Sequence, residues 1–293
     1  MKKLIPLVFW FICCLANTAN AASYAVPRSA TPVLNTPAFS SVFGGADGAS
    51  LKTDRCGQVR ALEFIALPGT VFTIRAQKTD GKNTIFRVET NEYPSPKDSA
   101  LYVDSRFVEL REEMPPSRLP TLPSKAAIIA ALKTSVGAPY VWGGNVQGGV
   151  GELIGLFYGG NVPEAARRKL TLAGLDCSGL LFQATGGWTP RNTSQLTSFG
   201  NAVRVAGKSL NEIVGSLEPL DLIVWNGHVI IVLDRQTVIE SRLECGKMGK
   251  GGVVTTLLQR RLAEILRIRR PVDSWPAAGK QRDVFVVRRW FVP

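Results

Sequence analysis

Residues 175–182 carry the sequence LDCSGLLF, in which a polar stretch around Cys177 precedes an apolar run. The apolar periodicity begins just after the cysteine, so Cys177 is predicted to lie at or near the N-terminus of a helix. The dipole and the unpaired backbone N–H groups of such a helix end stabilise a thiolate. The same N–H groups can form an oxyanion hole for a tetrahedral acyl intermediate. Cys177 is therefore the candidate nucleophile, and a buried structural thiol is the alternative interpretation.

A cysteine nucleophile needs a histidine within hydrogen-bond reach, and the chain contains one histidine, His228. Two apolar runs, 229–233 and 237–241, flank polar residues that begin at Asp234, which predicts a β-hairpin. If the hairpin is centred on Asp234, His228 and Glu240 lie directly opposite each other, with Cβ atoms ~5 Å apart. Glu240 would then orient the imidazole and favour its charged form. A structural strand histidine and a solvated glutamate are the alternatives.

Five short segments follow one another in the second half of the chain. They are Pro139–Gly144 (PYVWGG), Asp176–Leu180 (DCSGL), Pro190–Gln195 (PRNTSQ), Asp221–Leu222 (DL) and His228–Ile231 (HVII). Together they resemble the NlpC/P60 family of cell-wall endopeptidases, whose pattern is P-Y-x-W-G-G, D-C-S-G-L, P-R-x-S-x-Q, G-D-L and H-V-G-I. The resemblance covers roughly residues 125–245. It implies an α+β, papain-like fold in which the cysteine-bearing helix packs on an antiparallel sheet that carries the histidine.

The resemblance also implies a thiol hydrolase that cuts amide bonds in peptidoglycan stem peptides, commonly between γ-D-glutamate and diaminopimelate. Tyr140 would lie near the oxyanion site, and Asp176 and Ser178 would help bind the diaminopimelate or amine end of the substrate. Arg191 could contact a substrate carboxylate, or it could be an exposed arginine without such a role. No cofactor is expected, and a single histidine argues against zinc catalysis.

Three features depart from the family pattern. Residues 146–174 form a long, glycine-rich insert between the tryptophan and cysteine motifs, and this insert could be a loop or lid that shapes the cleft. Leu220 replaces the glycine of G-D-L, and Glu240 stands where the family usually has His, Asn or Gln. These departures leave open a non-catalytic wall-binding protein. Because the fold does not fix which bond is cut, an N-acetylmuramoyl-L-alanine amidase or an acyltransferase on the same fold is a further alternative.

The first residues resemble a secretory signal peptide. Lys2 and Lys3 precede an apolar stretch, 4–16, and the small residues 19–21 fit a cleavage site. The apolar stretch falls short of the ~20 residues that a membrane span needs. We therefore expect residues 1–21 to be removed, and the mature chain to act in the periplasm or at the cell-wall exterior without stable membrane insertion.

The mature chain is predicted to hold two domains. Residues 22–55 are rich in Ala, Ser, Pro and Gly and are interpreted as a flexible leader. Four short alternating runs within residues 56–113 predict strands and resemble a bacterial SH3-like β-barrel. Four prolines mark residues 114–124 as a linker. The catalytic domain then spans 125–293, beginning with a helix that Ser124 caps and Gly137 ends.

Cysteine count and charge limit the compartment and the partners. Beyond the signal only Cys56, Cys177 and Cys245 remain, an odd number for an exported protein. A bridge between Cys56 and Cys245 would leave Cys177 free, although spacing alone does not fix the pairing. The formal net charge is +12, which favours anionic partners. For an exported protein we expect the peptidoglycan stem peptide rather than nucleic acid. The basic C-terminal run, which comprises Arg260 and Arg261, residues 267–270, and Arg288 and Arg289, is interpreted as a charged face.

Overall fold

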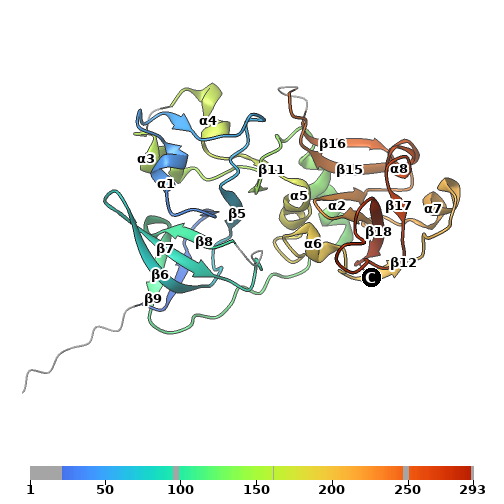
Figure 1. Cartoon of the computed structure of the whole chain (residues 1–293), viewed down its shortest axis with the longest axis horizontal. Coiled ribbons are helices and arrows are strands. Elements are labelled where there is room, and N and C mark those ends of the chain that lie inside the picture. The colour runs from blue at the N-terminus through green and yellow to red at the C-terminus, as the bar shows by residue number, and fades with distance from the viewer. Residues whose placement is uncertain (1–21, 95–98, 161, 247–250, 292–293) are drawn as a thin grey trace, which may run out of the picture.

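The computed structural model describes residues 22–94, 99–160, 162–246 and 251–291. They form two units, each built on a sheet of seven strands, which lie side by side in Figure 1. The predicted signal peptide, residues 1–21, lies outside the described residues. Among the described helices, none has the length and apolar character that crossing a bilayer requires.

The first sheet is antiparallel and follows the order β5-β2-β8-β7-β6-β1-β9. Its strands are β1 (Tyr24–Pro27), β2 (Thr31–Leu34), β5 (Leu62–Ala66), β6 (Phe72–Asp80), β7 (Asn83–Glu89), β8 (Leu101–Asp104) and β9 (Val108–Arg111). A 3-10 turn, η1 (Ser105–Phe107), joins the last two strands. The four runs predicted to be strands within residues 56–113 are therefore confirmed.

The prediction of a flexible leader at residues 22–55 is wrong. Strand β1 pairs with both β6 and β9, and β2 pairs with both β5 and β8, so both strands lie inside the sheet. A short helix, α1 (Phe39–Val42), and the small hairpin of β3 (Phe43–Gly44) and β4 (Ser50–Leu51) follow. The few apolar residues among the prolines and serines are the buried ones, and they supply enough contact to order the segment.

The insert at residues 146–174 is not a plain loop. It holds α3 (Glu152–Phe157) and α4 (Glu164–Leu170), and β10 (Asn145–Val146) and β11 (Gly174–Leu175) pair at its two ends. Leu153 and Leu172 are buried in the same apolar cluster as Phe39 and Phe43 of the N-terminal segment. Figure 1 shows α3 and α4 beside α1, at a distance from the second sheet. Burial of these apolar residues therefore makes the insert a part of the first core.

The linker and the first helix of the second unit agree with the sequence prediction. Residues 114–124 contain no helix or strand. Helix α2 (Lys125–Thr134) begins after Ser124, whose side chain accepts a hydrogen bond from the backbone N–H of Ala127 (3.2 Å). Gly137 adopts φ +86°, a conformation that favours glycine and ends the helical stretch.

The second sheet follows the order β12-β18-β13-β14-β15-β16, and β17 pairs in parallel with β18. Its strands are β12 (Asn201–Val203), β13 (Leu222–Trp225), β14 (His228–Val232), β15 (Thr237–Arg242), β16 (Gly252–Leu257), β17 (Arg270–Pro271) and β18 (Val284–Arg289). The helices of this unit, besides α2, are α5 (Cys177–Ala184), α6 (Thr193–Leu196), α7 (Leu210–Ser216) and α8 (Leu258–Leu266).

Helices cover both faces of the second sheet. Along β14, Val229 and Ile231 belong to the apolar cluster that contains α2 and α5, whereas Ile230 and Val232 belong to the cluster that contains α7 and α8. Successive strand residues point to opposite faces, so a strand buried on both faces is apolar throughout. This explains the unbroken run that follows His228, and the unit is a mixed α/β layer structure.

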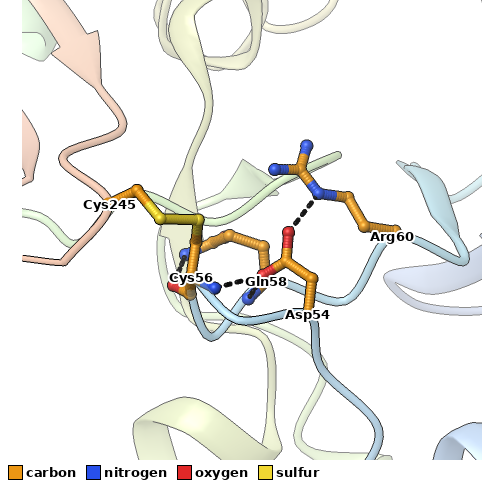
Figure 2. The surroundings of a disulfide bond; sticks show 5 residues. All are labelled: Asp54, Cys56, Gln58, Arg60 and Cys245. Atoms are coloured by element: carbon orange, nitrogen blue, oxygen red, sulfur yellow. Dashed lines mark hydrogen bonds and ion pairs between the residues drawn. A yellow bond between two sulfur atoms is a disulfide. The ribbon is translucent and has the colours of Figure 1, made fainter.

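A disulfide joins the two units. Cys56 precedes β5, Cys245 follows β15, and their bond spans 189 residues of sequence (Figure 2). Asp54 orders the loop of Cys56, because its carboxylate accepts hydrogen bonds from the backbone N–H groups of Cys56 (2.8 Å) and Gln58 (2.9 Å). Cys177 is the free cysteine among the described residues. The pairing that the sequence left open is thus the one between Cys56 and Cys245.

The turn before β13 contains Leu220, where the sequence pattern leads one to expect glycine. Leu220 adopts φ +78°, which costs a residue with a Cβ atom more than it costs glycine. The next residue, Asp221, is buried and pairs with Arg289 through two hydrogen bonds of 2.9 and 2.7 Å. The turn therefore keeps the backbone shape that a glycine would favour. Arg289 lies in this ion pair, so the interpretation of a solvated charged face is wrong for it.

Candidate active site

Helix α5 places Cys177 at its first residue, as the sequence predicts. The N-cap is Asp176, whose Oδ1 accepts a hydrogen bond from the backbone N–H of Gly179 (2.6 Å). Cys177 is largely buried, and its Sγ lies 3.9 Å from the carbonyl oxygen of Gly227. The cysteine thus lies at the positive end of a helix and beside the turn that leads to His228.

A two-residue turn brings His228 to the cysteine. Trp225 and His228 are paired across Asn226 and Gly227, and Gly227 has φ +93°. An Asn-Gly pair between two strands is a strong hairpin signal, because glycine accepts positive φ without strain. The backbone N–H of Gly227 donates to the hydroxyl of Thr193 (3.1 Å), so the P-R-x-S-x-Q segment fixes this turn.

Glu240 contacts His228, but the predicted register of the hairpin is wrong by one residue on each strand. Ile231 lies opposite Ile239 and Val232 opposite Val238, so the hairpin is centred on Arg235 instead of Asp234. Glu240 therefore lies diagonally across from His228. Diagonal neighbours remain within reach of long side chains, and the Nε2 of His228 lies 2.7 Å from the Oε2 of Glu240.

Glu240 also binds Arg261 of helix α8. The Nε of Arg261 donates to Oε1 (2.7 Å) and its Nη2 donates to Oε2 (3.0 Å), in a two-point contact. The Glu240 side chain is fully buried, and a buried carboxylate is costly unless its charge is matched. Glu264 accepts a further hydrogen bond from Nη1 of Arg261 (3.1 Å). A chain of charged contacts thus leads from His228 through Glu240 to α8.

These contacts set the charge on the histidine and the glutamate. Burial lowers the pKa of His228, but hydrogen bonds to the side chains of Cys177 and Glu240 and attraction to their charges raise it to about 9. Burial raises the pKa of Glu240, but His228 and Arg261 hold it below its usual value. At neutral pH the favoured state is therefore an imidazolium ion between the cysteine sulfur and a carboxylate. The expectation that a carboxylate partner raises the histidine pKa is confirmed.

Arg191 is a buried clamp on the helix cap, with an exposed fraction of 2%. Its partners are Asp176 Oδ1 (3.1 Å) and Oδ2 (2.6 Å), Ser178 Oγ (3.0 Å), Asn145 Oδ1 (3.1 Å) and the Gly144 carbonyl (3.4 Å). Because each of its side-chain nitrogens is engaged in these bonds, the guanidinium supports the cap. This differs both from the expected substrate contact and from an exposed arginine, since the buried carboxylate of Asp176 needs a permanent counter-charge.

Asp176 and Ser178 point into this same network. Both residues are buried, and the Ser178 hydroxyl lies 3.3 Å from Asp176 Oδ1. The geometry supports a capping role for Asp176, and its predicted contact with substrate stays a prediction, as does that of Ser178.

Asn145 carries the network into the first unit. Its Oδ1 accepts from the backbone N–H of Ile65 (2.9 Å), and its Nδ2 donates to the carbonyl of the same residue (2.8 Å). The side-chain amide thus makes the same pair of hydrogen bonds to β5 that the backbone of a neighbouring strand would make. Since Arg191 binds the same Oδ1, the first sheet and the N-terminus of α5 share one buried polar network.

Tyr140 lies near the cysteine and also lines a pocket of about 220 Å³. The other walls of this pocket come from Leu51, from residues 57–59, from the two neighbours of Tyr140 in the chain, from helix α4 and from residues 172–173. Burial raises the pKa of the Tyr140 phenol, and the nearby negative charges of Asp176 and Cys177 raise it further. Tyr140 therefore remains a neutral hydroxyl that can donate a hydrogen bond near the cysteine.

Sequence reasoning missed three residues of this site. Arg261 was assigned to a charged face, yet it lies three residues after Leu258 and four before Ile265, on the apolar side of α8. A lone arginine in an apolar stripe was the available signal. Thr193 stands within the PRNTSQ segment and Asn145 directly follows PYVWGG, but their partners are distant in sequence, so no local pattern assigns them. Among the described residues, no group of three or more His, Cys, Asp and Glu side chains is placed to hold a metal ion.

Comparison with known proteins finds similarity among solved structures. No protein-family model matches the chain, and no curated protein matches it. An NlpC/P60 family protein from Bacillus cereus ATCC 10987 is similar in structure over 92% of this chain and 63% of that chain, with 15% sequence identity and a TM-score of 0.33. The chain therefore spans less than two thirds of the length of that protein.

Proposed function

We propose that the protein is an exported thiol hydrolase of the NlpC/P60 kind that cuts amide bonds in peptidoglycan stem peptides. The observation that carries the proposal is the position of His228, whose Nε2 lies 2.7 Å from the buried Glu240 carboxylate and whose turn contacts the sulfur of Cys177 through the Gly227 carbonyl. A structural thiol does not need an imidazolium neighbour held by a buried carboxylate, whereas a nucleophile does.

In this proposal the two ring nitrogens of His228 have different tasks. Nε2 is engaged by Glu240, so Nδ1 is the nitrogen that serves Cys177. In the first step the thiolate attacks the amide carbon, and the backbone N–H groups at the start of α5 stabilise the oxyanion. Nδ1 then gives its proton to the leaving amine, the C–N bond breaks, and a thioester remains.

Neutral His228 carries out the second step. Its Nδ1 takes a proton from water, the resulting hydroxide attacks the thioester carbon, and the C–S bond breaks. The products are a carboxylic acid, a thiolate and an imidazolium, so the starting state is restored. In this scheme Glu240 is a positioning residue, and Tyr140 is a neutral hydroxyl donor at the cleft.

The substrate class rests on the motif resemblance. We propose the γ-D-glutamyl–diaminopimelate bond as the target, with no cofactor. A formal net charge of +12 is compatible with a carboxylate-rich polymer as partner. We further propose that the first sheet is an SH3-like wall-binding domain and that the second unit is a papain-like catalytic domain.

The proposed location is the periplasm or the cell-wall exterior. The disulfide between Cys56 and Cys245 supports it, because such bonds persist in oxidising compartments. Residues 1–21 would serve as the signal peptide.

Mass spectrometry of purified muropeptides and free stem tripeptide tests the proposal. Wild type, Cys177→Ala and His228→Gln are incubated with each substrate. New fragments should arise with wild type, none with Cys177→Ala, and ~10²–10⁴-fold fewer with His228→Gln, the usual contribution of a general acid–base. Matching thermal unfolding curves control for misfolding.

Fragment masses identify the bond. A cut between γ-D-glutamate and diaminopimelate supports the proposed specificity, whereas release of the whole stem from muramic acid would identify an amidase. If wild type yields no fragment from pH 5 to 9, either with the Cys56–Cys245 disulfide intact or with reductant present, the result supports a non-catalytic wall-binding protein.

A further inference from the structure

The residue whose role reaches beyond this scheme is Arg261. Its side chain is mostly buried against the sheet and makes the two-point contact with Glu240 already described. Its neighbour Arg260 is three-quarters exposed and pairs only with Glu264 among the described residues. Helix α8 thus presents one arginine to the site and one to solvent.

We propose that Arg261 is a positioning residue: by holding the Glu240 carboxylate ionised, it lets His228 release its Nδ1 proton and act as the base that resolves the thioester. The deacylation part of this inference rests on the proposed function, because only a thiol hydrolase forms the thioester. The effect on the protonation of His228 does not depend on it.

Several charged groups surround the pair and fix the sign of the effect. Helix α5 contributes Cys177, strand β15 contributes Glu240, and α8 contributes Arg261 with Glu264. After α8, the guanidinium of Arg269 lies 4.7 Å from the ring of Trp225, whose centroid is 5.1 Å from that of His228. When Cys177 becomes a thioester, its negative charge disappears. Glu240 is then the anion in contact with the histidine, and Arg261 is the cation in contact with Glu240.

The number of protons on the pair decides whether His228 can act as a base. With one proton, the ring keeps Nε2–H toward the Glu240 carboxylate, and the Nδ1 lone pair is free. With two protons, the second sits on Nδ1 while the first is either on Nε2 or on the carboxylate. Nδ1 is protonated in both arrangements, so neither of them can accept a proton from water.

A positive charge beside the carboxylate favours the one-proton state. Removal of Arg261 removes that charge, so the pair binds its second proton more tightly. An opposite charge in close contact shifts a pKa by ~1–3 units. We therefore expect the one-proton form at neutral pH to fall about tenfold or more, and deacylation to slow by the same factor.

The first experiment measures the titration of the histidine directly. Because His228 is the only histidine of the chain, its ring resonances in an NMR spectrum of the untagged protein need no assignment among several. The Cys177→Ala background imitates the loss of the sulfur charge. In it, Arg261→Gln should raise the midpoint of the titration by about one unit or more, while Arg260→Gln leaves it unchanged.

Two more variants keep this experiment decisive. Arg261→Lys retains the charge and should return most of the wild-type midpoint. Arg261→Met keeps an unbranched side chain and removes the charge, so it replaces Arg261→Gln if that variant does not fold. An unchanged midpoint in a folded, uncharged variant overturns the inference, whether or not the protein cleaves any peptide.

The second experiment follows turnover. With a cleaved stem peptide, intact-protein mass spectrometry should detect more thioester in Arg261→Gln than in wild type or in Arg260→Gln. The pH dependence of deacylation should also move to higher pH. If wild type cleaves no peptide, the proposed function fails while the titration result stands. A cleaving Arg261→Gln variant with normal deacylation refutes the positioning role.

Discussion

The two sheets of this molecule differ in how their cores are assembled from the sequence. The first core draws on residues 25–43, on strands β5 to β9 and on the insert between residues 150 and 172. The second core lies within residues 122–291, where neighbouring strands are mostly consecutive hairpins. The first unit therefore depends on contacts between distant segments, and the second is built largely from local ones.

This difference indicates which substitutions should affect the chemistry of the site and which should affect the stability of the fold. The second unit carries Cys177, His228, Glu240 and Arg261 on its own elements, so substitutions there should change chemistry with little effect on the first sheet. The first unit reaches the site through Asn145 and through the disulfide loop at Cys56. Changes in the first unit should appear mainly as lost stability.

The largest stability effect is expected from breaking the tether between the units. The double variant Cys56→Ser with Cys245→Ser opens a bond that spans 189 residues, and loops of this size give about 5 kcal/mol. Urea unfolding should show this loss, and reductant should destabilise wild type but not the double variant. Cys177→Ala is the control, since it keeps the disulfide. Equal stability of wild type and double variant would show that the two units hold together without the bond.

The next effect concerns the insert. Leu153 is fully buried in the first core, so Leu153→Ala should cost about 3 kcal/mol of unfolding free energy. Leu257, at 62% exposure on the second unit, is the control, and Leu257→Ala should change stability by less than about 0.5 kcal/mol. If Leu153→Ala instead altered substrate preference without loss of stability, the insert would be a lid after all.

The sequence predicted the second unit better than the first for a physical reason. Helix α2, the position of Cys177 and the two strands after His228 follow from periodicity, caps and turns that are local. The burial of residues 22–55 and of the insert depends on segments more than a hundred residues apart, and no local pattern records such contacts. Leu153 is an example, because it belongs to the same buried cluster as Phe39, which lies more than a hundred residues earlier in the chain.

The candidate site shows the same division. Cys177, His228 and Glu240 were identified from motif and spacing, although the register that joins the last two depended on a turn centre that spacing left one residue uncertain. Arg261 contacts Glu240 across 21 residues and from a different element. Its role became visible only when α8 was placed on the sheet.

The pH dependence of the free energy of unfolding tests the charged pair of His228 and Glu240, and its expected effect is of intermediate size. Burial lowers the pKa of His228, but its contacts with Cys177 and Glu240 raise it to about 9, against ~6.5 in an unfolded chain. In the folded state His228 thus binds its proton more tightly between these values. The stability from His228 is fully present below about pH 6.5 and is lost as the pH rises through about 9.

Urea unfolding of wild type and His228→Gln between pH 6 and 9.5 measures this loss. We expect wild type to lose on the order of 2 kcal/mol relative to the variant over that range. The sign of the change is informative, because the contacts of His228 predict that the free energy of unfolding of wild type falls toward alkaline pH. Parallel curves for the two proteins would mean that His228 is not charged in the folded state at neutral pH.

The smallest expected effect is at Leu220, where the usual order of stability of alanine and glycine variants should be reversed. This residue is buried but has φ +78°, a backbone conformation that costs a non-glycine residue about 1 kcal/mol. Leu220→Ala and Leu220→Gly both lose the buried side chain, but only glycine also relieves the backbone. We therefore expect the glycine variant to be more stable than the alanine variant by about 1 kcal/mol in urea unfolding.

At Leu222, in strand β13, the usual order should hold, with alanine the more stable by ~0.5–1 kcal/mol. The same order at both positions would show that the turn before β13 stores no strain. The reversed order would show that the second unit retains a glycine-type turn and fills it with a leucine because the core gains more from burial than the backbone loses.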